Sequence, residues 1–330
     1  MSRLSITIGC GSYDRTRPIQ DGRIPVEGCD VNFVPLEPEE AFFRSLRYQE
    51  FDVSELSFNS FCMLSSQDAC PYVGLPAFVS RVFRHAAIYI RTDRGIKKPE
   101  DLKGKKIGLP EYQITAAVWA RGMLQEEYGV APEDVHWFTG GQEEPGRDER
   151  TPLKLDRDVS ITPIGPKQTL CGMLENGELD AIITARNPSV FLRGLPNVDR
   201  LFPNYIEAEQ AYYRKTGLFP IMHIIGVKKT LAEREPWLVS SVYKAFREAR
   251  DFAMRDVATR AQLRVMCPWV EAFVAQVKTV LGEDYWQYGV AANRKSVEAM
   301  LRYSYGQGLM ARQMTPEELF APETLEVSRV

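Results

Sequence analysis

The chain has 330 residues, with 41 Lys and Arg against 44 Asp and Glu, so its formal net charge is −3. Hydrophobic residues make up 44% and charged residues 26%, a globular composition that excludes collagen, a disordered tail and a disulfide-rich miniprotein. Because there is no large positive excess, the composition argues against nucleic acid as a partner. The length allows one large domain or two of ordinary size.

Strands and helices alternate over the first part of the chain. Apolar and alternating patterns predict strands at 4–8, 31–34, 51–56, 82–90 and 105–109. Helices are expected at Pro38–Tyr48 and Thr115–Tyr128, and Gly129 is well placed to end the second. This alternation predicts an α/β protein.

The second part of the chain ends in helices. Strands are expected at 134–138, 180–184 and 219–227, and helices at 235–255, 269–281 and 293–305. The segment 139–158 is rich in Gly, Pro and alternating charges. It is expected to be an exposed loop, with a flap over a site as the alternative.

Two parts of the chain repeat one another. Residues 46–53 match residues 174–181, and each stretch reads as a helix end, a tight turn and a strand led by Asp. The loops upstream share a spacing, in which Gly9, Tyr13 and Thr16 mirror Gly108, Tyr112 and Thr115. The shared order of these matches predicts two α/β lobes of similar build.

Motifs for cofactors, metals and covalent catalysis are missing. The chain has no GxGxxG after a strand, no P-loop and no GxSxG elbow. Its three histidines, His85, His136 and His223, are far apart and form no HxH or HExxH pattern. The sequence therefore predicts neither a cofactor nor a dedicated transition-metal site.

The sequence also predicts the cellular compartment of the protein. The N-terminus lacks the apolar stretch of a signal peptide, and no run of 18 apolar residues predicts a membrane span. The six cysteines form no CxxC pair and mostly sit in apolar surroundings. Buried free thiols in a reducing, cytoplasmic compartment, away from membranes, are the expectation.

Polar groups gather where the predicted strands end, which is where open α/β sheets bind ligands. They are Tyr13, Asp14, Arg15 and Arg17, then Ser57 and Asn59, then Tyr112, Gln113 and Thr115, and finally Arg186 and Asn187. Arginine suits carboxylates because its guanidinium binds both oxygens, and the helix expected at Thr115 would attract an anion. The alternatives are solvated surface arginines and a plain helix N-terminus.

Two histidines lie in apolar segments that we expect to cross between the lobes. His85, preceded by Arg84, interrupts 82–90, and His223 interrupts 219–227. A histidine facing a cleft there could move protons near neutral pH. The alternative is a core histidine with its hydrogen bonds satisfied. His136, in the strand expected at 134–138, is expected to be structural.

Six segments carry a resemblance to a known family. They are residues 83–89, 101–112, 115–124, 219–223, 293–294 and 307–309. Together they span nearly the whole chain and resemble the 4,5-dihydroxyphthalate decarboxylases. The Leu-Lys-Gly-Lys-Lys-Ile-Gly stretch within 101–112 is common to solute-binding proteins and indicates the fold. Residues 119–122 and 222–223 look more particular to the decarboxylases.

The resemblance implies a two-lobed, type II periplasmic-binding-protein-like fold with the ligand in a cleft between the lobes. Lobe one would comprise residues 1–90 and 225–330, and lobe two residues 91–224. It also implies a carboxy-lyase of phthalate degradation, which converts 4,5-dihydroxyphthalate into protocatechuate and CO₂ without a cofactor.

The implied chemistry assigns roles to the candidate residues. Each carboxylate of the substrate is para to a hydroxyl, so the phenol can supply the electron push while the protein orients a dianion and moves protons. His223 is the expected proton donor to the ring carbon, and His85 is the second choice as a base or an orienting group. The expected substrate-binding residues are Tyr13, Arg15, Arg17, Ser57, Asn59, Arg84, Tyr112, Gln113, Thr115 and Arg186, with carboxylates assigned to Arg15, Arg17 and Arg186.

Two other functions stay open. One is a cytoplasmic protein that binds an aromatic acid without reaction, and the other is a different small-molecule enzyme on the same fold. The clustered cysteines of the pyrimidine-precursor synthases on this fold are missing here. The exact acid, help from a divalent ion, the role of 139–158 and a possible homo-oligomer are left undecided.

Overall fold

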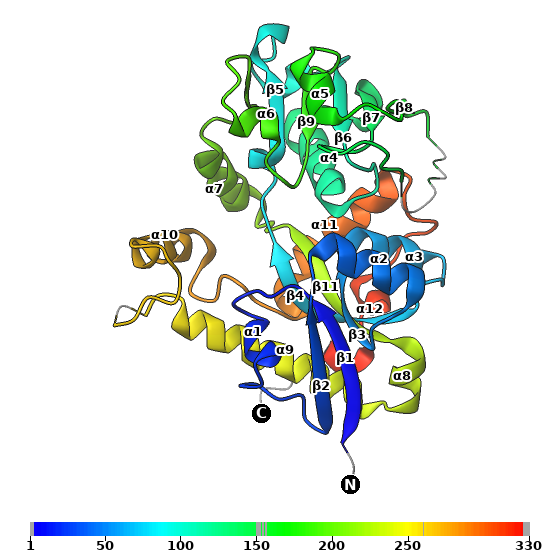
Figure 1. The fold of residues 1–330 in the computed structure, drawn as a ribbon, viewed down its shortest axis with the longest axis vertical. Coiled ribbons are helices and arrows are strands. Elements are labelled where there is room, and N and C mark those ends of the chain that lie inside the picture. Colours follow the sequence, from blue (N-terminus) through cyan, green and yellow to red (C-terminus); the bar gives the residue numbers. More distant parts are fainter. Residues whose placement is uncertain (1–2, 150–152, 154, 156, 260, 326–330) are drawn as a thin grey trace. The chain divides into compact units, whose positions relative to one another are not determined.

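Two compact α/β units make up the protein (Figure 1). The structure is a computed structural model that describes residues 3–149, 153, 155, 157–259 and 261–325. Unit 1 comprises Met1–Arg81, Ile221–Glu298 and Met314–Val330, and unit 2 comprises Val82–Pro220 and Ala299–Gln313. Each unit is built on one mixed sheet.

Unit 1 has a five-stranded sheet in the order β2-β1-β3-β11-β4. Its strands are β1 (Leu4–Cys10), β2 (Cys29–Pro35), β3 (Val53–Ser57), β4 (Tyr72–Arg81) and β11 (Ile221–Lys228). β1 is parallel to β2 and β3, whereas β11 is antiparallel to β3 and β4. The helices of this unit are α1 (Arg17–Gln20), α2 (Pro38–Tyr48), α3 (Phe58–Ser66), α8 (Lys229–Arg234), α9 (Trp237–Asp256), α10 (Val270–Leu281) and α12 (Pro316–Leu319).

Unit 2 has a six-stranded sheet in the order β10-β5-β9-β6-β7-β8. Its strands are β5 (Ile88–Arg91), β6 (Lys106–Leu109), β7 (His136–Thr139), β8 (Ile161–Pro163), β9 (Ala181–Ile183) and β10 (Val198–Arg200). Its helices are α4 (Thr115–Tyr128), α5 (Leu170–Glu175), α6 (Ser189–Leu192) and α7 (Tyr205–Thr216), joined by the second half of α11 (Val290–Gly306). Short 3₁₀ turns add His85–Ala87, Thr92–Arg94, Pro99–Leu102 and Pro132–Asp134 here, and Pro322–Thr324 in unit 1.

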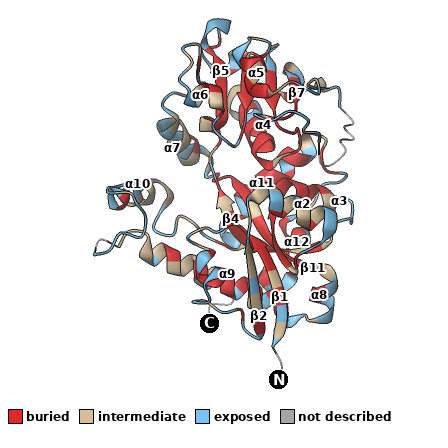
Figure 2. Cartoon of the chain, in the orientation of Figure 1, coloured by how far each residue is buried: buried red, intermediate tan, exposed pale blue. Residues whose placement is uncertain are grey.

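The two sheets lie within the buried core of their units (Figure 2). All five residues of β3 are buried, although three of them, Ser54, Glu55 and Ser57, are polar. A central strand is enclosed on both faces, so its polar side chains also point into the protein and need internal partners. This constraint makes Glu55, in the middle of β3, the starting point for the site.

The internal repeat has a structural basis in two aspartates. Asp52 precedes β3, and its carboxylate accepts the N–H of Thr7 at 2.9 Å while its own N–H donates to the carbonyl of Thr7 at 3.0 Å. Asp180 precedes β9 and makes the same pair of bonds with Lys106, both at 2.9 Å. In each unit an Asp thus fixes the start of one parallel strand against its neighbour.

Most predicted elements are confirmed, including α2 and α4 with their predicted bounds and Gly129 in the left-handed conformation at φ 65°. The single strand predicted at 82–90 is wrong. β4 ends at Arg81, a 3₁₀ turn covers His85–Ala87, and β5 begins only at Ile88. Sequence reasoning missed β4 because it contains Gly74 and Pro76. The strand lies at the edge of its sheet, where a missing N–H is tolerated.

The units differ from the predicted lobes in three places. Residues 221–224, which include His223, lie in unit 1, because β11 pairs with β3 and β4. Residues 82–90 lie in unit 2, because β5 pairs with β9 and β10. Residues 299–313 also lie in unit 2, where Tyr303 packs edge-on against Trp119 of α4. The cleft expected between the lobes stays a prediction.

Among the described residues, no helix has the length and apolarity needed to cross a membrane.

The packing of α4 against α11 gives a first testable prediction. A Cβ on Gly122 would lie 2.3 Å from the Tyr303 ring, so Gly122→Ala should lower the free energy of unfolding by about 1–3 kcal/mol. Gly306, in α11, has open space around its missing Cβ. Gly306→Ala is therefore the matched control and should be neutral or stabilising by roughly 0.5–1 kcal/mol. Urea unfolding of both variants measures the difference; equal values for the two would contradict the packing argument.

Candidate functional site

Glu55 holds a fully buried carboxylate in the middle of β3. Its Oε1 accepts hydrogen bonds from the Tyr13 hydroxyl at 2.8 Å and from His223 Nδ1 at 2.6 Å. Its Oε2 accepts from the backbone N–H of Gly11 at 2.8 Å and from the Cys10 thiol at 3.5 Å. Both oxygens are therefore satisfied by groups from β1, the loop after it, and β11.

These donors decide the charge of Glu55. Burial alone would raise the pKa of this carboxyl, but the hydrogen bond and charge of His223, with the Gly11 N–H and the Tyr13 hydroxyl, lower it. Because the folded pKa is lowered, the ionised form is favoured, and its stabilising effect is lost only as the pH falls through that pKa. Glu55 is thus a carboxylate at neutral pH.

His223 is fixed by the sheet and by its partner. On β11 it stands opposite Ser57 of β3 and Ser80 of β4, beside a register shift in the β11–β4 ladder. Irregularities of this kind commonly re-aim a side chain next to a functional site. The edge of Phe42 packs on the imidazole, with ring centroids 4.8 Å apart. Since Nδ1 faces Glu55, Nε2 is the nitrogen left without a hydrogen bond to the described residues.

Tyr13 links this pair to a fixed arginine. Its hydroxyl donates to Glu55, and its ring lies 4.4 Å from the Arg15 guanidinium, which Trp286 covers at 4.5 Å. Arg15 also donates from Nε to the Val79 carbonyl at 2.5 Å and from Nη1 to Asp14. Within the described part of the chain, Nη2 makes no hydrogen bond, so one edge of this fixed guanidinium remains available.

The other predicted residues of unit 1 have different surroundings. Arg17 is exposed at the start of α1. Ser57 and Asn59 are buried at the start of α3, where Ser57 accepts from the Ser60 hydroxyl at 3.2 Å and the Asn59 amide contacts Met63 Sδ at 3.3 Å. The structure therefore brings Tyr13, Arg15 and His223 together around Glu55 and leaves Arg17 on the surface.

In unit 2 the predicted residues after β6 are buried and held by a second polar group. Tyr112, Gln113 and Thr115 are all buried. The fully buried Glu111 accepts from Gln113 Nε2 at 2.9 Å and from Arg147 at 2.6 and 2.9 Å. Arg147 belongs to the predicted 139–158 loop, of which residues 150–152, 154 and 156 lie outside the described residues. The described part of that loop therefore folds back onto the strand end.

Arg186 follows β9 with an exposed side chain, and its carbonyl accepts from Gln142 at 3.4 Å. The next residue, Asn187, accepts the Tyr89 hydroxyl at 2.6 Å. Arg84 is buried, and desolvation lowers its pKa to about 10 although Glu209 opposes this. These arginines thus differ sharply in their access to a solute.

His85 is enclosed by aromatic rings. Its ring lies 5.0 Å from Phe202 and 5.2 Å from Tyr212, and neither nitrogen has a hydrogen-bond partner among the described residues. Only 1% of the residue is exposed, and this burial lowers the pKa of the imidazole to about 4. His85 is therefore a neutral, packed histidine at neutral pH, whereas His136 is exposed.

Sequence reasoning missed Glu55, although a signal was present. Glu55 is an acidic residue inside the strand predicted at 51–56, and we assigned it no role from the sequence. The position next to a predicted ligand-binding strand end could have identified it. Within the described residues, no three His, Cys, Asp or Glu side chains group so that they could hold a metal ion. A mechanism without metal stays a prediction.

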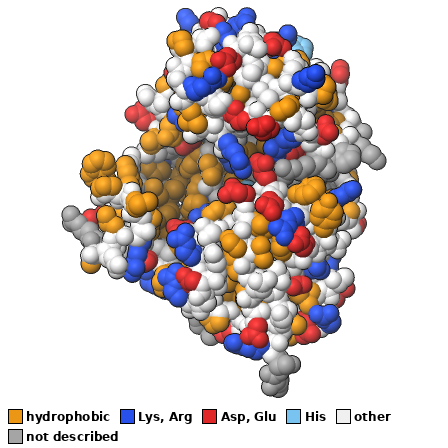
Figure 3. Space-filling view, viewed as in Figure 1, with side chains coloured by type: hydrophobic (Ala, Val, Ile, Leu, Met, Phe, Trp, Pro, Cys, Tyr) orange, Lys and Arg blue, Asp and Glu red, His pale blue; other side chains and the backbone are white. Residues whose placement is uncertain are grey.

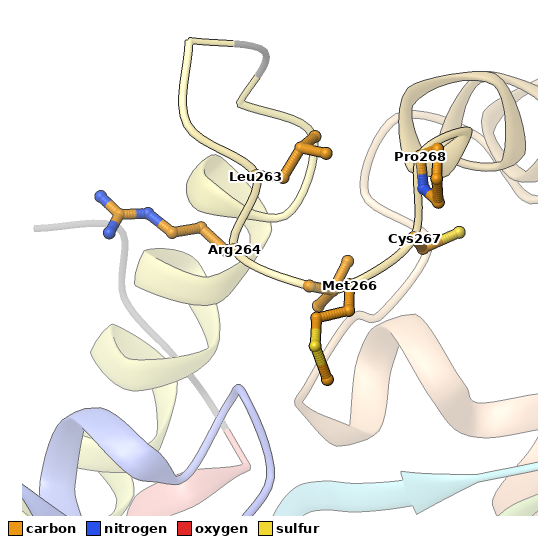
Figure 4. Close-up of a pocket in the computed structure, with 6 residues that line it drawn as sticks. Leu263, Arg264, Met266, Cys267 and Pro268 are labelled. Carbon is orange, nitrogen blue, oxygen red and sulfur yellow. The ribbon is translucent and has the colours of Figure 1, made fainter.

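A shallow pocket elsewhere has no such chemistry. It is lined by six consecutive residues, Leu263–Pro268, on the loop before α10 (Figure 4). Arg264 is the one permanently charged side chain among these six, and it pairs with Asp256. We therefore place the candidate site at Glu55 and His223.

Comparison with known proteins bears on this geometry. The chain is 42% identical over 330 residues to a 4,5-dihydroxyphthalate decarboxylase from Comamonas testosteroni, with 100% of both chains covered. It is 46% identical over 214 residues to a protein of the same name from Pseudomonas putida, covering 65% of this chain and 83% of that one. Residues 25–145 match the family described as "ABC transporter, phosphonate, periplasmic substrate-binding protein".

Solved structures show the fold. The periplasmic aliphatic sulphonate binding protein of Escherichia coli superposes with a TM-score of 0.55 at 14% identity, covering 98% of this chain and 99% of that one. The alkanesulfonate-binding protein of Xanthomonas axonopodis pv. citri gives 0.51 at 15% identity, with 98% of both chains covered. The predicted type II periplasmic-binding-protein fold is thereby confirmed.

The burial of His85 leads to a pH prediction. As the pH falls from the ordinary histidine pKa of 6.5 toward about 4, the unfolded chain binds a proton at this residue and the folded protein does not. The free energy of unfolding should therefore fall by about 3 kcal/mol more in the wild type than in His85→Phe over this interval. His136→Gln, at an exposed histidine, is the control and should follow the wild type. Urea unfolding at pH 7 and pH 4.5 measures the effect; parallel curves for wild type and His85→Phe would contradict it.

Proposed function

Because the chain belongs to the 4,5-dihydroxyphthalate decarboxylase family, we propose that it converts 4,5-dihydroxyphthalate into protocatechuate and CO₂, with His223 as the proton donor and Glu55 as its partner. One observation carries the assignment of residues, the 2.6 Å hydrogen bond between His223 Nδ1 and a carboxylate that is completely buried. The reaction makes the protein a carboxy-lyase of phthalate degradation.

The substrate provides most of the electronic driving force. Loss of the proton from one hydroxyl pushes electron density to the para carbon, which bears a carboxylate. A proton added to this carbon gives a dienone, and the C–C bond to the carboxylate then breaks. The electron pair of that bond restores the aromatic ring as CO₂ leaves. The protein has to orient the dianion and supply one proton at the ring carbon.

His223 is suited to deliver that proton. The buried carboxylate of Glu55 fixes Nδ1 as a donor and stabilises the imidazolium, so that Nε2–H is the proton that can be transferred. After transfer, the neutral imidazole keeps its Nδ1–H on Glu55 and can be reprotonated at Nε2. The aromatic cage around His85 keeps its nitrogens from solvent, so our proposal gives the ring-carbon proton to His223 and treats His85 as a packed residue.

The carboxylates need cationic and N–H donors. We assign one to Arg15, because Tyr13, Trp286 and Asp14 hold its guanidinium in place and Nη2 is available. The roles of Arg17 and Arg186, and of the backbone around Gln113 and Thr115, stay proposals of the same kind. Ser57, Asn59, Arg84 and Tyr112 are buried within their units, so we expect them to shape the site rather than to bind substrate directly.

One incubation separates this function from simple binding. Purified, EDTA-treated protein is mixed with 4,5-dihydroxyphthalate, and protocatechuate and CO₂ are followed. Turnover without added metal supports the reaction and the metal-free proton transfer. Turnover only after a divalent ion is restored overturns the metal-free mechanism, and tight binding without turnover favours an aromatic-acid binding protein. We also propose that the protein acts in the cytoplasm, as the sequence predicts.

The exposed apolar surface around α10 supports a homo-oligomer. Of the twelve residues of α10 only Val270 is buried, and the adjoining side chains of Leu263, Met266, Trp269 and Phe273 are exposed. Hydrophobic side chains gather over this helix in the space-filling view (Figure 3). Large contiguous apolar patches are uncommon on monomers. We propose that a second copy of the chain covers this one.

Removal of the Glu55 charge should abolish proton delivery. Glu55→Gln keeps the shape of the side chain but leaves the imidazolium without its carboxylate, so kcat should fall by about 10²- to 10⁴-fold. Glu50→Gln, an exposed glutamate five residues away that pairs with Arg44, is the matched control and should retain wild-type kcat. Steady-state rates of protocatechuate formation measure both.

His223→Gln provides the second test, because His223 is at the edge of the buried network and its loss threatens folding less than a change at Glu55. It should lose activity to a similar extent, whereas His85→Phe should retain it. Near-normal kcat in both Glu55→Gln and His223→Gln would sink the assignment.

Disruption of the apolar surface should separate the copies. The double variant Trp269→Asp and Phe273→Asp should run at the monomer mass of 37.5 kDa in light scattering, while the wild type runs at a multiple of it. Leu192→Asp, at an exposed leucine of unit 2, is the control and should match the wild type. A monomeric wild type would contradict the proposal.

A further inference from the structure

A second carboxylate of the chain occupies an anion-binding position in unit 2. Glu149 Oε1 accepts the backbone N–H of Tyr112, and the N–H of Gln113 acts on the same carboxyl as a hydrogen-bond donor. These N–H groups lie in the turn between β6 and the fourteen-residue helix α4. Such a turn attracts anions through its free N–H groups and the helix dipole.

This position has polar groups that Glu149 does not bind. Two fully buried side chains beside it, Tyr112 and Arg121, keep polar atoms without hydrogen-bond partners among the described residues, namely the Tyr112 hydroxyl and Arg121 Nη1. The Arg121 guanidinium lies 3.7 Å from the centre of the Tyr112 ring and donates from Nη2 to the Tyr112 carbonyl at 2.7 Å. Glu149 Oε2 is itself buried, and none of the residues that the structure describes bonds to it. The carboxylate is therefore held through one oxygen only.

The charges around Glu149 are mixed. Burial raises the pKa of Glu149 to about 7, the charge of the nearby Glu111 adds to this, and Arg121 opposes it. Glu111 is itself paired with Arg147, two residues before Glu149. The remaining charges here, Glu133 and Arg157, act on Tyr112. The ionised form of Glu149 is thus bound weakly, because burial and the charge of Glu111 disfavour it while the N–H groups of the turn favour it.

We propose that the Glu149 carboxylate is a built-in competitor that occupies a carboxylate subsite at Tyr112 and Gln113, and that a carboxylate of the substrate displaces it. Glu149 is held through Oε1, whereas an external carboxylate, which no chain restrains, is able to turn both of its oxygens toward donors. The choice of an aromatic carboxylate as the ligand rests on the proposed function. The competition itself rests on the contacts of Glu149.

Benzoate is the probe, because it presents one aromatic carboxylate and has no hydroxyl to drive decarboxylation. Calorimetric titration at pH 8 should give Glu149→Ala about 5- to 10-fold tighter binding than the wild type, because removing the competitor raises the fraction of open sites. Glu149→Gln should lie between them. Glu144→Gln changes an exposed glutamate of the same segment and should bind like the wild type.

The pH dependence gives a second readout. Wild-type binding should tighten from pH 8 to pH 6, as Glu149 takes up a proton and competes less, and this change should vanish in Glu149→Ala. Equal or weaker binding by Glu149→Ala and Glu149→Gln at pH 8 would make Glu149 a structural anchor and overturn the inference. If the wild type turns over 4,5-dihydroxyphthalate but Glu149→Ala binds benzoate no more tightly than the wild type, only this inference is overturned. Tighter benzoate binding by Glu149→Ala in a protein without turnover supports it and removes only the decarboxylase proposal.

Discussion

A charged side chain inside a fully enclosed strand sets the terms for unit 1. Moving a carboxylate out of water is costly unless donors replace its hydration, and Glu55 finds four of them. They come from the end of β1, the loop after it, and β11. The loop must turn back so closely that a Cβ on Gly11 would lie 2.4 Å from the Tyr13 ring. The need to satisfy one buried charge therefore fixes the loop, the Tyr13 ring and the histidine together.

The two units share the hydrogen bonds that begin one of their strands but differ in their buried polar groups. Asp52 and Asp180 make the same two strand-start bonds, so the backbone frame is common. The buried polar groups differ. In unit 1 the Glu55 carboxylate, in the middle of β3, bonds to His223. In unit 2 Glu111, after the end of β6, pairs with Arg147, and Glu149 accepts an N–H of the turn before α4.

Local patterns in the sequence were enough for five of the six longest helices and for most strands, but they missed α3 and α7. Pro38–Tyr48 and Thr115–Tyr128 follow from apolar spacing, and Gly129 ends the second helix. The strand-end rule led to Tyr13 and Arg15, whereas His223 stands out as a histidine inside an apolar strand. What failed depended on neighbours in space. Pro76 is tolerated because β4 lies at an edge, and Glu55 is buried because β3 lies at the centre. A strand's place in its sheet is a long-range property, which no short window contains.

The segments that carried the family resemblance divide into architecture and chemistry. Arg121 donates to Gln307, and Tyr303 fills the space that Gly122 leaves open, so the stretches around 119–122 and 307–309 join α4 to the end of α11. Asn293 accepts from Arg81 at 2.8 Å and ties the start of α11 to β4. Only the stretch around His223 reaches the buried carboxylate. Similarity to the family around residues 119–122, 293–294 and 307–309 therefore reflects packing between helices and strands. In our proposal the reaction depends on a far smaller set of contacts, those between Glu55 and His223. A relative that kept the frame but lost either residue would then share the fold without this proposed means of moving a proton.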